Sequence, residues 1–540
     1  MASPCSLRCT RSCSQRIRCC GVGTHSSAGA VGRHGRGGAY DRLGGGFAWR
    51  PEAFMRREAL HATRANADCD YTKSMASCMV IGAGPAGTLL VSRLLEQRTT
   101  SDDLSEGGGP ILWISRDEQF GAGAVRLYED APANTIAERV KQVFVGERAP
   151  LLSRSLYANG SQKIKDIFEL AYAPTGGVGS VNVGGMDLRS FHPLKRIADA
   201  LDLLGDAILE QGADVVQARP RTNITRLTQM HGGLWAAYDD TGERVGVARD
   251  VALAVGVQPK PPSVHIDADV IPLTTALSMR QLRRHAAERP ISHAVVVGAS
   301  HSGALAAMYL SEVADHVTVL HRSPVKIAIN LGDQYGYLHE FTGLKGAAAG
   351  FAIEQGWTSI GASLRLVDTT AQHNAIDACC DRLACEFKHA RLSNADMPRV
   401  SAKARRNVRL IASANNNGDN IGDVLRASHP VPPTHVVHAC GFGRSTNDLP
   451  ELVDVHGKSM KHQDLIWDAV AAEAAGGFPP SQFPAPRGLH GIGIAFPELY
   501  RSFYARDGED VIGVGGFDAR AIVLARELMK AKECTIATEF

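Results

Sequence analysis

The stretch Cys78-Met79-Val80-Ile81-Gly82-Ala83-Gly84-Pro85-Ala86-Gly87 decides the fold. Its first four residues are apolar and predict a short buried strand, and its glycines have the spacing Gly-x-Gly-x-x-Gly. Apolar residues at helical spacing follow at positions 89, 90, 91, 94 and 95. The stretch therefore predicts a strand, a tight turn and a helix in succession.

Each glycine in this turn has a steric role. Gly82 permits the tight turn, Gly84 lets the backbone approach a pyrophosphate, and Gly87 lets the helix pack closely on the strand. Proline suits the first helical position, and the positive helix end then faces the phosphates. We therefore predict a dinucleotide site formed by Gly82, Ala83, Gly84, Pro85, Ala86 and Gly87.

The second strand is expected at Ile111–Ser115, where many such folds place an acidic residue that binds ribose hydroxyls. This chain has Ser115 followed by Arg116, and we place both at the same site. A turn-rich, meander-like stretch follows, and an apolar strand at 250–256 then leaves through prolines. We add Ile224, from the meander, and Gly256, from the strand end, to the cofactor contacts.

A second strand, turn and helix begins at Ala294. Four apolar residues lead into Gly298-Ala299-Ser300-His301-Ser302-Gly303, and the next strand ends at His321-Arg322. Arg322 stands where an acid would select NADH, so its positive charge favours the 2′-phosphate of NADPH. The cofactor contacts predicted here are Gly298, Ser300, His301, Ser302, Gly303, His321 and Arg322. A solvated arginine at a strand end is the alternative for Arg322.

Charge and length exclude several classes of protein. The net charge is +2, but residues 1–74 carry +7, which leaves −5 on the remainder. A mildly acidic body with no basic stripe argues against a nucleic-acid partner. No apolar run reaches the roughly 20 residues of a membrane-spanning helix. Five of the twelve cysteines lie at Cys5, Cys9, Cys13, Cys19 and Cys20, and no zinc spacing occurs in the body, so neither disulfides nor a metal site is predicted.

Residues 1–74 are rich in Arg, Ser, Gly and Cys, and their first fifty residues contain a single acid, Asp41. This composition is typical of an organelle transit peptide and also of a disordered extension. Met75 is an alternative start, because it directly precedes the first predicted strand. We expect a cytoplasmic protein, or a mitochondrial one if the segment is a transit peptide.

The two glycine turns, the strand ends at Gly256 and Gly441, and Arg322 resemble those of the two-dinucleotide-binding-domain flavoproteins. The resemblance covers most of the chain after Met75 and is to the flavin-containing monooxygenase-like branch. It implies FAD at the first site, NADPH at the second and a small-molecule substrate. It also implies that Asn134 and Thr135 face the flavin and that Gly441 and Gly493 lie at the cofactors. Asn134 is the catalytic candidate, and a turn before a helix capped by Thr135 is the alternative.

Two departures bear on the chemistry. The Phe-x-Gly-x-x-x-His signature of the monooxygenases is absent between Gly256 and Ala294. The segments 341–346 and 489–498 are similar to those of a pyridine nucleotide-disulfide oxidoreductase-like family. Redox cysteines of disulfide reductases are not expected, because no cysteine lies between Cys78 and Cys379.

We predict an α/β fold with two Rossmann-like, three-layer dinucleotide-binding domains. The FAD domain comprises residues 75–289 and 430–540, and the NAD(P)H domain, 290–429, is inserted in it. The predicted function is an FAD-dependent, NAD(P)H-using oxidoreductase, with oxygenation of a small nucleophile as the first interpretation. The alternatives are a flavin reductase or oxidase that passes electrons to a quinone or oxygen, and a non-enzymatic NADPH sensor. The sequence indicates no oligomeric state and no particular substrate.

Overall fold

The computed structural model describes residues 75–100, 109–128, 130–158, 167, 182–183, 186–187, 191–262, 264–330, 337–338, 343–359, 362–363, 366, 407–412, 421–443, 449–462, 465–466, 483–496 and 514–536. They all belong to one compact unit, Tyr71–Phe540. The extension 1–74 and the cysteines at 379–385 lie outside the described residues.

The first sheet is parallel and has the strand order β25-β11-β1-β2-β7. Its strands are β1 (Cys78–Ile81), β2 (Ile111–Ile114), β7 (Val216–Arg219), β11 (Val251–Leu253) and β25 (Leu489–Gly491). The predicted first strand has the observed bounds, and the second ends one residue earlier than expected. The last strand, β25, comes from the far end of the chain and pairs with β11. The first domain is therefore discontinuous in sequence.

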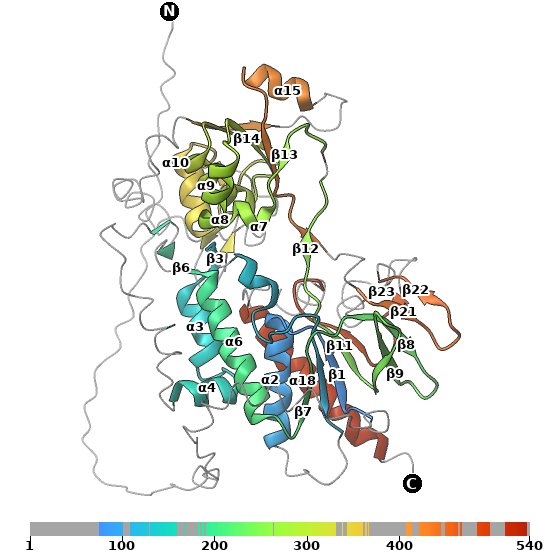
Figure 1. Cartoon of the computed structure of the whole chain (residues 1–540). Helices are drawn as coiled ribbons and strands as arrows, with labels where there is room; N and C mark the ends of the chain where they lie inside the picture. Colours follow the sequence, from blue (N-terminus) through green and yellow to red (C-terminus); the bar gives the residue numbers. More distant parts are fainter. Residues whose placement is uncertain are drawn as a thin grey trace, which may run out of the picture. The chain divides into compact units, whose positions relative to one another are not determined.

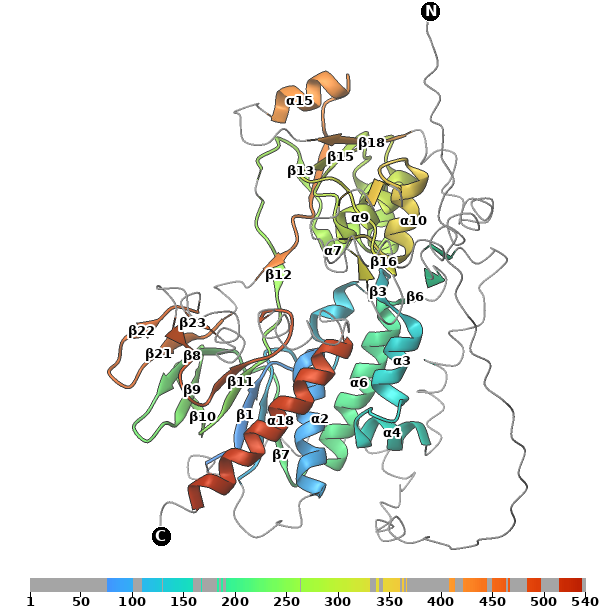
Figure 2. The ribbon, with the colours of Figure 1, turned by 180° about the vertical axis from the view of Figure 1, so that it is seen from behind.

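Side-chain alternation gives the two faces of this sheet different partners. Cys78 and Val80 of β1 belong to the core that includes the helices, whereas Met79 and Ile81 pack on the other face. The helical layer consists of α2 (Pro85–Thr100), α6 (Leu194–Gln211) and α18 (Val514–Ile536). Figures 1 and 2 both show α18 alongside α2, and the two helices are in contact. Burial of each large apolar side chain here contributes about 2 kcal/mol.

The opposite face carries the predicted meander within a second layer, whose strand pairs are antiparallel except for one parallel pair. Its strands are β8 (Ile224–Gln229), β9 (Trp235–Asp239), β10 (Arg244–Ala248), β21 (Glu451–Val453) and β22 (Ser459–Met460), in the order β10-β9-β8-β21-β22. Trp235 is fully buried between the layers, and its indole N–H donates to the carbonyl of Arg487 at 3.1 Å. The first domain thus has three layers, as predicted.

The second sheet is also parallel, in the order β13-β19-β14-β15-β18. Its strands are β13 (Asp269–Val270), β14 (His293–Val297), β15 (His316–His321), β18 (Val408–Ala412) and β19 (His435–His438). One core contains residues of α7 (Leu273–Ala276), α8 (Met279–Glu288), α9 (His301–Val313) and α10 (Gly346–Glu354). A smaller core on the other face includes α15 (Ile421–Ser428). This domain therefore also has three layers.

The second domain extends beyond its predicted bounds. β13, α7 and α8 precede residue 290, and β19 follows residue 429, yet all of them pack in the second domain. The chain enters and leaves it through β12 (Gln258–Pro259) and β20 (Phe442–Gly443), which pair antiparallel. The change of domain therefore lies close to Gly256 and Gly441 rather than at 290 and 429. The prolines after Gly256 indicated where the chain leaves the first domain. The predicted boundary at 290 was instead placed just before the second glycine turn.

Shorter elements complete the described chain. They are η4 (Gly123–Tyr128), β3 (Pro132–Ile136), α3 (Ala137–Val145), α4 (Leu151–Ala158), β4 (Asn182–Val183), β5 (Met186–Asp187), β6 (Phe191–Pro193), β16 (Ile329–Asn330), β17 (Tyr337–Leu338), β23 (Leu465–Ile466) and β24 (Phe483–Pro484). Within the described residues, no helix has the length and apolar character required to cross a bilayer.

Candidate cofactor sites

The first glycine turn leaves no room for side chains at its two ends. Gly82 has a φ of +113°, and a Cβ added there would lie 2.3 Å from the carbonyl oxygen of Ala254, which directly follows the neighbouring strand β11. A Cβ on Gly87 would lie 2.0 Å from the carbonyl oxygen of Gly82. Only glycine therefore fits either position, and the start of α2 is held directly against the ends of β1 and β11.

The middle of the same turn is open. A Cβ added to Gly84 would meet no atom within 4 Å. The helix begins at the next residue, Pro85, as predicted, so the amide groups of its first turn lie beside this open space. A loop covers the turn from one side, because the amide of Gly121 donates to the carbonyl of Ala83 at 2.8 Å. Amides, helix dipole and open space together suit a bound pyrophosphate.

Ser115 and Arg116 lie just after β2, at the same edge of the sheet. The hydroxyl of Ser115 accepts a hydrogen bond from the amide of Asp117 at 3.1 Å, which leaves its own proton available. Arg116 is exposed. The structure thus puts a hydroxyl and a cation where many related folds have a carboxylate, and their contact with adenosine remains a prediction.

Two further predicted glycines reach this edge from distant parts of the chain. Gly256 follows β11 with a φ of +74°, and a Cβ there would meet nothing within 4 Å. Gly493 follows β25, and a Cβ there would lie 3.0 Å from the Cβ of Ala86 on α2. Gly493 is therefore brought to the first turn of α2 by the pairing of β25 with β11.

The second glycine turn repeats the first. Gly298 has a φ of +108°, and a Cβ there would lie 2.4 Å from the carbonyl oxygen of Ala439. A Cβ on Gly303 would lie 1.9 Å from the carbonyl oxygen of Gly298. Gly441 has a φ of +90° with nothing within 4 Å, which makes it the counterpart of Gly256. The two sites therefore share one backbone design.

At the middle of the second turn, Ser300 replaces the glycine found in the first. Ser300 is exposed and precedes α9, and its side chain makes no capping hydrogen bond, so the hydroxyl is available to a phosphate. Ser302 is half-buried in the first turn of the helix. The serine therefore replaces open space with a hydrogen-bond donor.

His301 and Lys345 add polar groups at this helix end. The Nε2 atom of His301 is buried and has no hydrogen-bond partner among the described residues. Burial and the nearby charge of Lys345 lower the pKa of His301 to about 4, so its ring is neutral at neutral pH. Lys345 is buried at the N-cap of α10. Lys345 lies in segment 341–346, but the sequence alone does not show that this lysine is buried.

The end of β15 carries the remaining predicted contacts. Arg322 is exposed, and within the described chain its guanidinium makes no hydrogen bond or ion pair. The Nδ1 atom of His321 lies 3.0 Å from the carbonyl oxygen of Ser323. In the parallel sheet β15 lies next to β14, so its end lies beside the second glycine turn. This position suits a group that binds the 2′-phosphate of an adenosine.

The segment that contains Asn134 and Thr135 forms β3, and its side chains lie outside the described residues. Its neighbours are nevertheless defined. The hydroxyl of Ser278 donates to the carboxylate of Asp130 at 2.6 Å, and the hydroxyl of Tyr309 donates to the Asp130 carbonyl at 3.1 Å. β3 therefore follows a point at which the two domains are joined.

Ile224 lies at the start of β8 and is buried in the core between the first sheet and the meander. Its side chain is used in packing, so only its backbone remains for a cofactor contact. Asp518 also differs from expectation. It follows Gly515 and Gly516, which suits either a helix cap or a contact with the ribityl chain of a flavin, but α18 begins at Val514 and Asp518 binds Arg93 of α2.

The residues present fit two dinucleotides. Each turn joins a parallel strand to a helix and leaves its middle open or hydroxyl-bearing, as the diphosphate of a dinucleotide requires. The buried, unpartnered Nε2 of His301 is a polar atom that a ligand at the second turn would satisfy. Gly82, Gly84, Gly87 and Gly493 would hold FAD, and Ser300, His301 and Arg322 would hold NADPH.

No family model matches the chain. A curated relative, the monooxygenase AgnR1 of Paecilomyces divaricatus, is 25% identical over 437 residues, which cover 78% of this chain and 90% of the relative. Among solved structures, OTEMO with FAD bound is 11% identical with a TM-score of 0.45 and covers 85% of both chains. An oxidised steroid monooxygenase bound to NADP is 12% identical, with a TM-score of 0.45 and 86% of both chains covered. An ornithine N-hydroxylase of Kutzneria sp. 744 is 13% identical, with a TM-score of 0.46 over 85% of this chain and all of that chain.

Proposed function

We propose that this chain, which resembles the flavin-containing monooxygenase-like proteins as its sequence predicts, is an FAD-dependent oxidoreductase that uses NADPH. The observation that carries the proposal is the repeated geometry of the two glycine turns. In each, a positive-φ glycine lies against a neighbouring strand end and a second glycine lies against the first. Two such turns on two parallel sheets support the binding of two dinucleotides, and electron transfer between coenzymes is the chemistry that uses both.

Oxygenation of a small nucleophilic substrate, such as an amine or a sulfide, is the reaction we propose. Its support is the monooxygenase relative, which aligns along 78% of the chain and therefore spans both cofactor domains. When bound, FAD would supply the hydride acceptor and the site of oxygen reduction, and NADPH would supply the hydride.

The chain's own residues position the two coenzymes. The first turn of α2 binds one diphosphate and the first turn of α9 binds the other, with the hydroxyl of Ser300 as an added donor. Arg322 binds the 2′-phosphate through its charged fork, which neutral side chains cannot match. Asn134 remains the candidate for a hydrogen bond beside the flavin ring, because β3 follows the junction between the domains.

One observation favours a second function, a flavin reductase or oxidase. The segment between Gly256 and Ala294 lacks the Phe-x-Gly-x-x-x-His signature of the monooxygenases, and in the structure it forms β12, β13, α7 and α8. In this alternative the same two sites operate, and the electrons pass to a quinone or to oxygen without oxygen insertion.

Anaerobic titration of the FAD-reconstituted protein with NADPH tests the proposal. We expect the flavin absorbance to bleach with about one equivalent of NADPH, because the two sites bring one hydride donor to one acceptor. The same titration with NADH should need a higher concentration. In air, an oxygenated amine or sulfide supports the monooxygenase, and peroxide alone supports the reductase or oxidase. A protein that takes up no FAD, or a flavin that NADPH does not reduce, contradicts both.

A further inference from the structure

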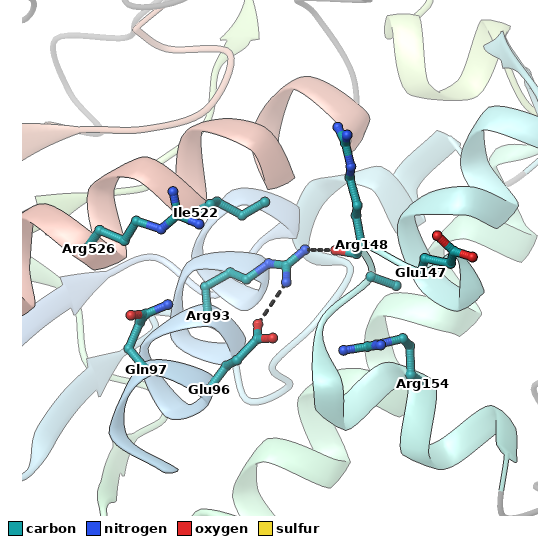
Figure 3. A pocket seen from close by; sticks show the side chains of 9 residues that line it. Arg93, Glu96, Gln97, Glu147, Arg148, Arg154, Ile522 and Arg526 are labelled. Carbon is teal, nitrogen blue, oxygen red and sulfur yellow. Dashed lines mark hydrogen bonds and ion pairs between the residues drawn. The ribbon is translucent and has the colours of Figure 1, made fainter. Parts of the chain in front are cut away.

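A cavity separate from the glycine turns lies among α2, α4, α18 and the turn between α3 and α4 (Figure 3). Its volume is about 400 Å³, and its described lining consists of Arg93, Glu96, Gln97, Glu147, Arg148, Ala149, Arg154, Ile522 and Arg526. Arg93 lies eight residues beyond Pro85, which places it about 12 Å along the helix axis from the diphosphate end of α2. The cavity is therefore not part of the proposed cofactor sites.

The arginine at the centre of the cavity is already neutralised. The guanidinium of Arg93 donates to Asp518 from Nε and Nη2, at 2.8 and 2.7 Å, and to Glu96 from Nη1 at 2.7 Å. It also donates to the carbonyl of Arg148, which fixes the turn between α3 and α4 against α2. Arg93 thus organises the cavity walls, and its charge is offset by Asp518 and Glu96.

Three further arginines also line the cavity: Arg148, Arg154 and Arg526. Within the described chain none of these side chains makes a hydrogen bond or an ion pair. The Nε atom of Arg154 is buried without an acceptor. In Figure 3, Arg93 lies between Arg526 of α18 and Arg154 of α4. A buried cationic donor without an acceptor is costly, and an anion in the cavity would remove that cost.

The one opposing lining carboxylate not engaged by Arg93 is Glu147, which is exposed. Three unpaired cations against one carboxylate leave a positive surplus. Arginine forks bind the paired oxygens of carboxylates and phosphates. The volume is within the range of small-molecule sites and exceeds the need of a lone inorganic ion. Ile522 and Ala149 supply apolar surface for a carbon skeleton.

We propose that this cavity binds a small organic polyanion whose phosphate or carboxylate groups contact Arg154 and Arg526. The ligand bridges α4 and α18 and so holds the outer helices of the first domain together. The proposal does not depend on the oxidoreductase activity, because no lining residue belongs to either glycine turn.

Calorimetric titration of the full chain, saturated with FAD and NADP⁺ so that both cofactor sites are filled, tests the proposal. Citrate probes for a polycarboxylate ligand and inorganic pyrophosphate for a phosphate ligand, with acetate as a singly charged control. We expect one of the two polyanions to bind with one-to-one stoichiometry. The double change Arg154→Gln and Arg526→Gln should weaken that binding at least tenfold. Arg283→Gln, an exposed arginine on α8, is the matched control and should leave it unchanged.

If the double variant does not fold, a variant that should bind the polyanion more tightly provides a second test. Glu147→Gln removes the opposing carboxylate and should strengthen binding severalfold. The FAD content of every variant should stay at the wild-type level, which separates this site from the cofactor sites. Failure of both polyanions to bind at millimolar concentration overturns the proposal. So does equal affinity in the double variant, or unchanged affinity in Glu147→Gln.

Discussion

The guanidinium of Arg93 on α2 and the carboxylate of Asp518 on α18 face each other through two hydrogen bonds, of 2.8 and 2.7 Å. The two residues are 425 positions apart in the sequence, and their side chains are only 6% and 10% exposed. The pair ties the helix that opens the chain's first nucleotide fold to the final helix. The first domain is therefore built from both ends of the described chain.

Loss of one partner leaves the other charge buried and unpaired. We expect Asp518→Asn to lower the free energy of unfolding by about 3 kcal/mol, measured by urea denaturation. The double change Arg93→Met and Asp518→Leu should cost less than the single change, because it removes both charges together. A single variant within about 0.5 kcal/mol of wild type would show that the pair adds little to stability.

The first glycine turn separates folding from cofactor binding at neighbouring positions. Gly84→Ala adds a Cβ that meets no protein atom within 4 Å, so the apoprotein should keep its stability. The same methyl group points into the space assigned to the pyrophosphate, and we expect FAD affinity to fall at least tenfold. Fluorescence titration with FAD and thermal unfolding of the apoprotein measure the two effects.

Gly82→Ala is the matched comparison for that experiment. Its Cβ would lie 2.3 Å from the carbonyl oxygen of Ala254, so the apoprotein itself should be destabilised. If Gly84→Ala binds FAD as tightly as wild type, the diphosphate does not lie at this turn. If both variants lose stability equally, the open space at Gly84 is not present in solution.

Local sequence predicted the two strand-turn-helix units better than the extent of the domains. The strand, turn and helix at Cys78–Gly87 and at Ala294–Gly303 were predictable because each is encoded within about ten residues, by steric demands that only glycine meets. Domain membership depends on pairing between distant segments. β13 joins the second sheet by pairing with β19, about 165 residues later, and no local pattern records that choice.

The hydrogen-bond partners of buried polar side chains also could not be predicted from the sequence. Asp518 and Arg93 are 425 residues apart, and only the packing of α18 on α2 brings them together. The structure likewise places the Nε2 atom of His490 3.4 Å from the carboxylate of Asp250, which is 240 residues away in the sequence. Buried polar groups are satisfied by whichever element packs beside them, so their partners follow from topology.

Arg322 should decide the choice of nicotinamide cofactor. It is exposed at the end of β15 and uncommitted within the described chain, so its charge is available to a 2′-phosphate. We expect Arg322→Gln to raise the KM for NADPH about tenfold or more, the cost of one charged hydrogen bond, and to leave the KM for NADH nearly unchanged. Steady-state reduction kinetics with both cofactors measure this, with Arg284→Gln on α8 as control. Equal changes for both cofactors would assign Arg322 a structural role.

Histidines gather at the amino ends of the strands in the second sheet. The ring centroids of His316 and His429 are 4.2 Å apart, and those of His293 and His429 are 4.7 Å apart. His293 is fully buried, with Nδ1 2.7 Å from the carbonyl oxygen of Val431 and Nε2 2.9 Å from the hydroxyl of Thr318. Burial lowers the pKa of His293 from its ordinary 6.5, and the charges of His429, His316 and Arg409 lower it further.

This lowered pKa makes the stability of the second domain depend on pH in one direction. Below about pH 6.5 the unfolded chain takes up a proton that folded His293 resists, so the free energy of unfolding should fall as the pH falls through that value. Above it the contribution is complete and constant. Urea unfolding from pH 5 to pH 8 measures the slope, and His293→Gln should make it shallower. His265→Gln, at an exposed position, should leave it unchanged. If the slope in His293→Gln equals that of the wild type, the proton uptake lies elsewhere in the molecule.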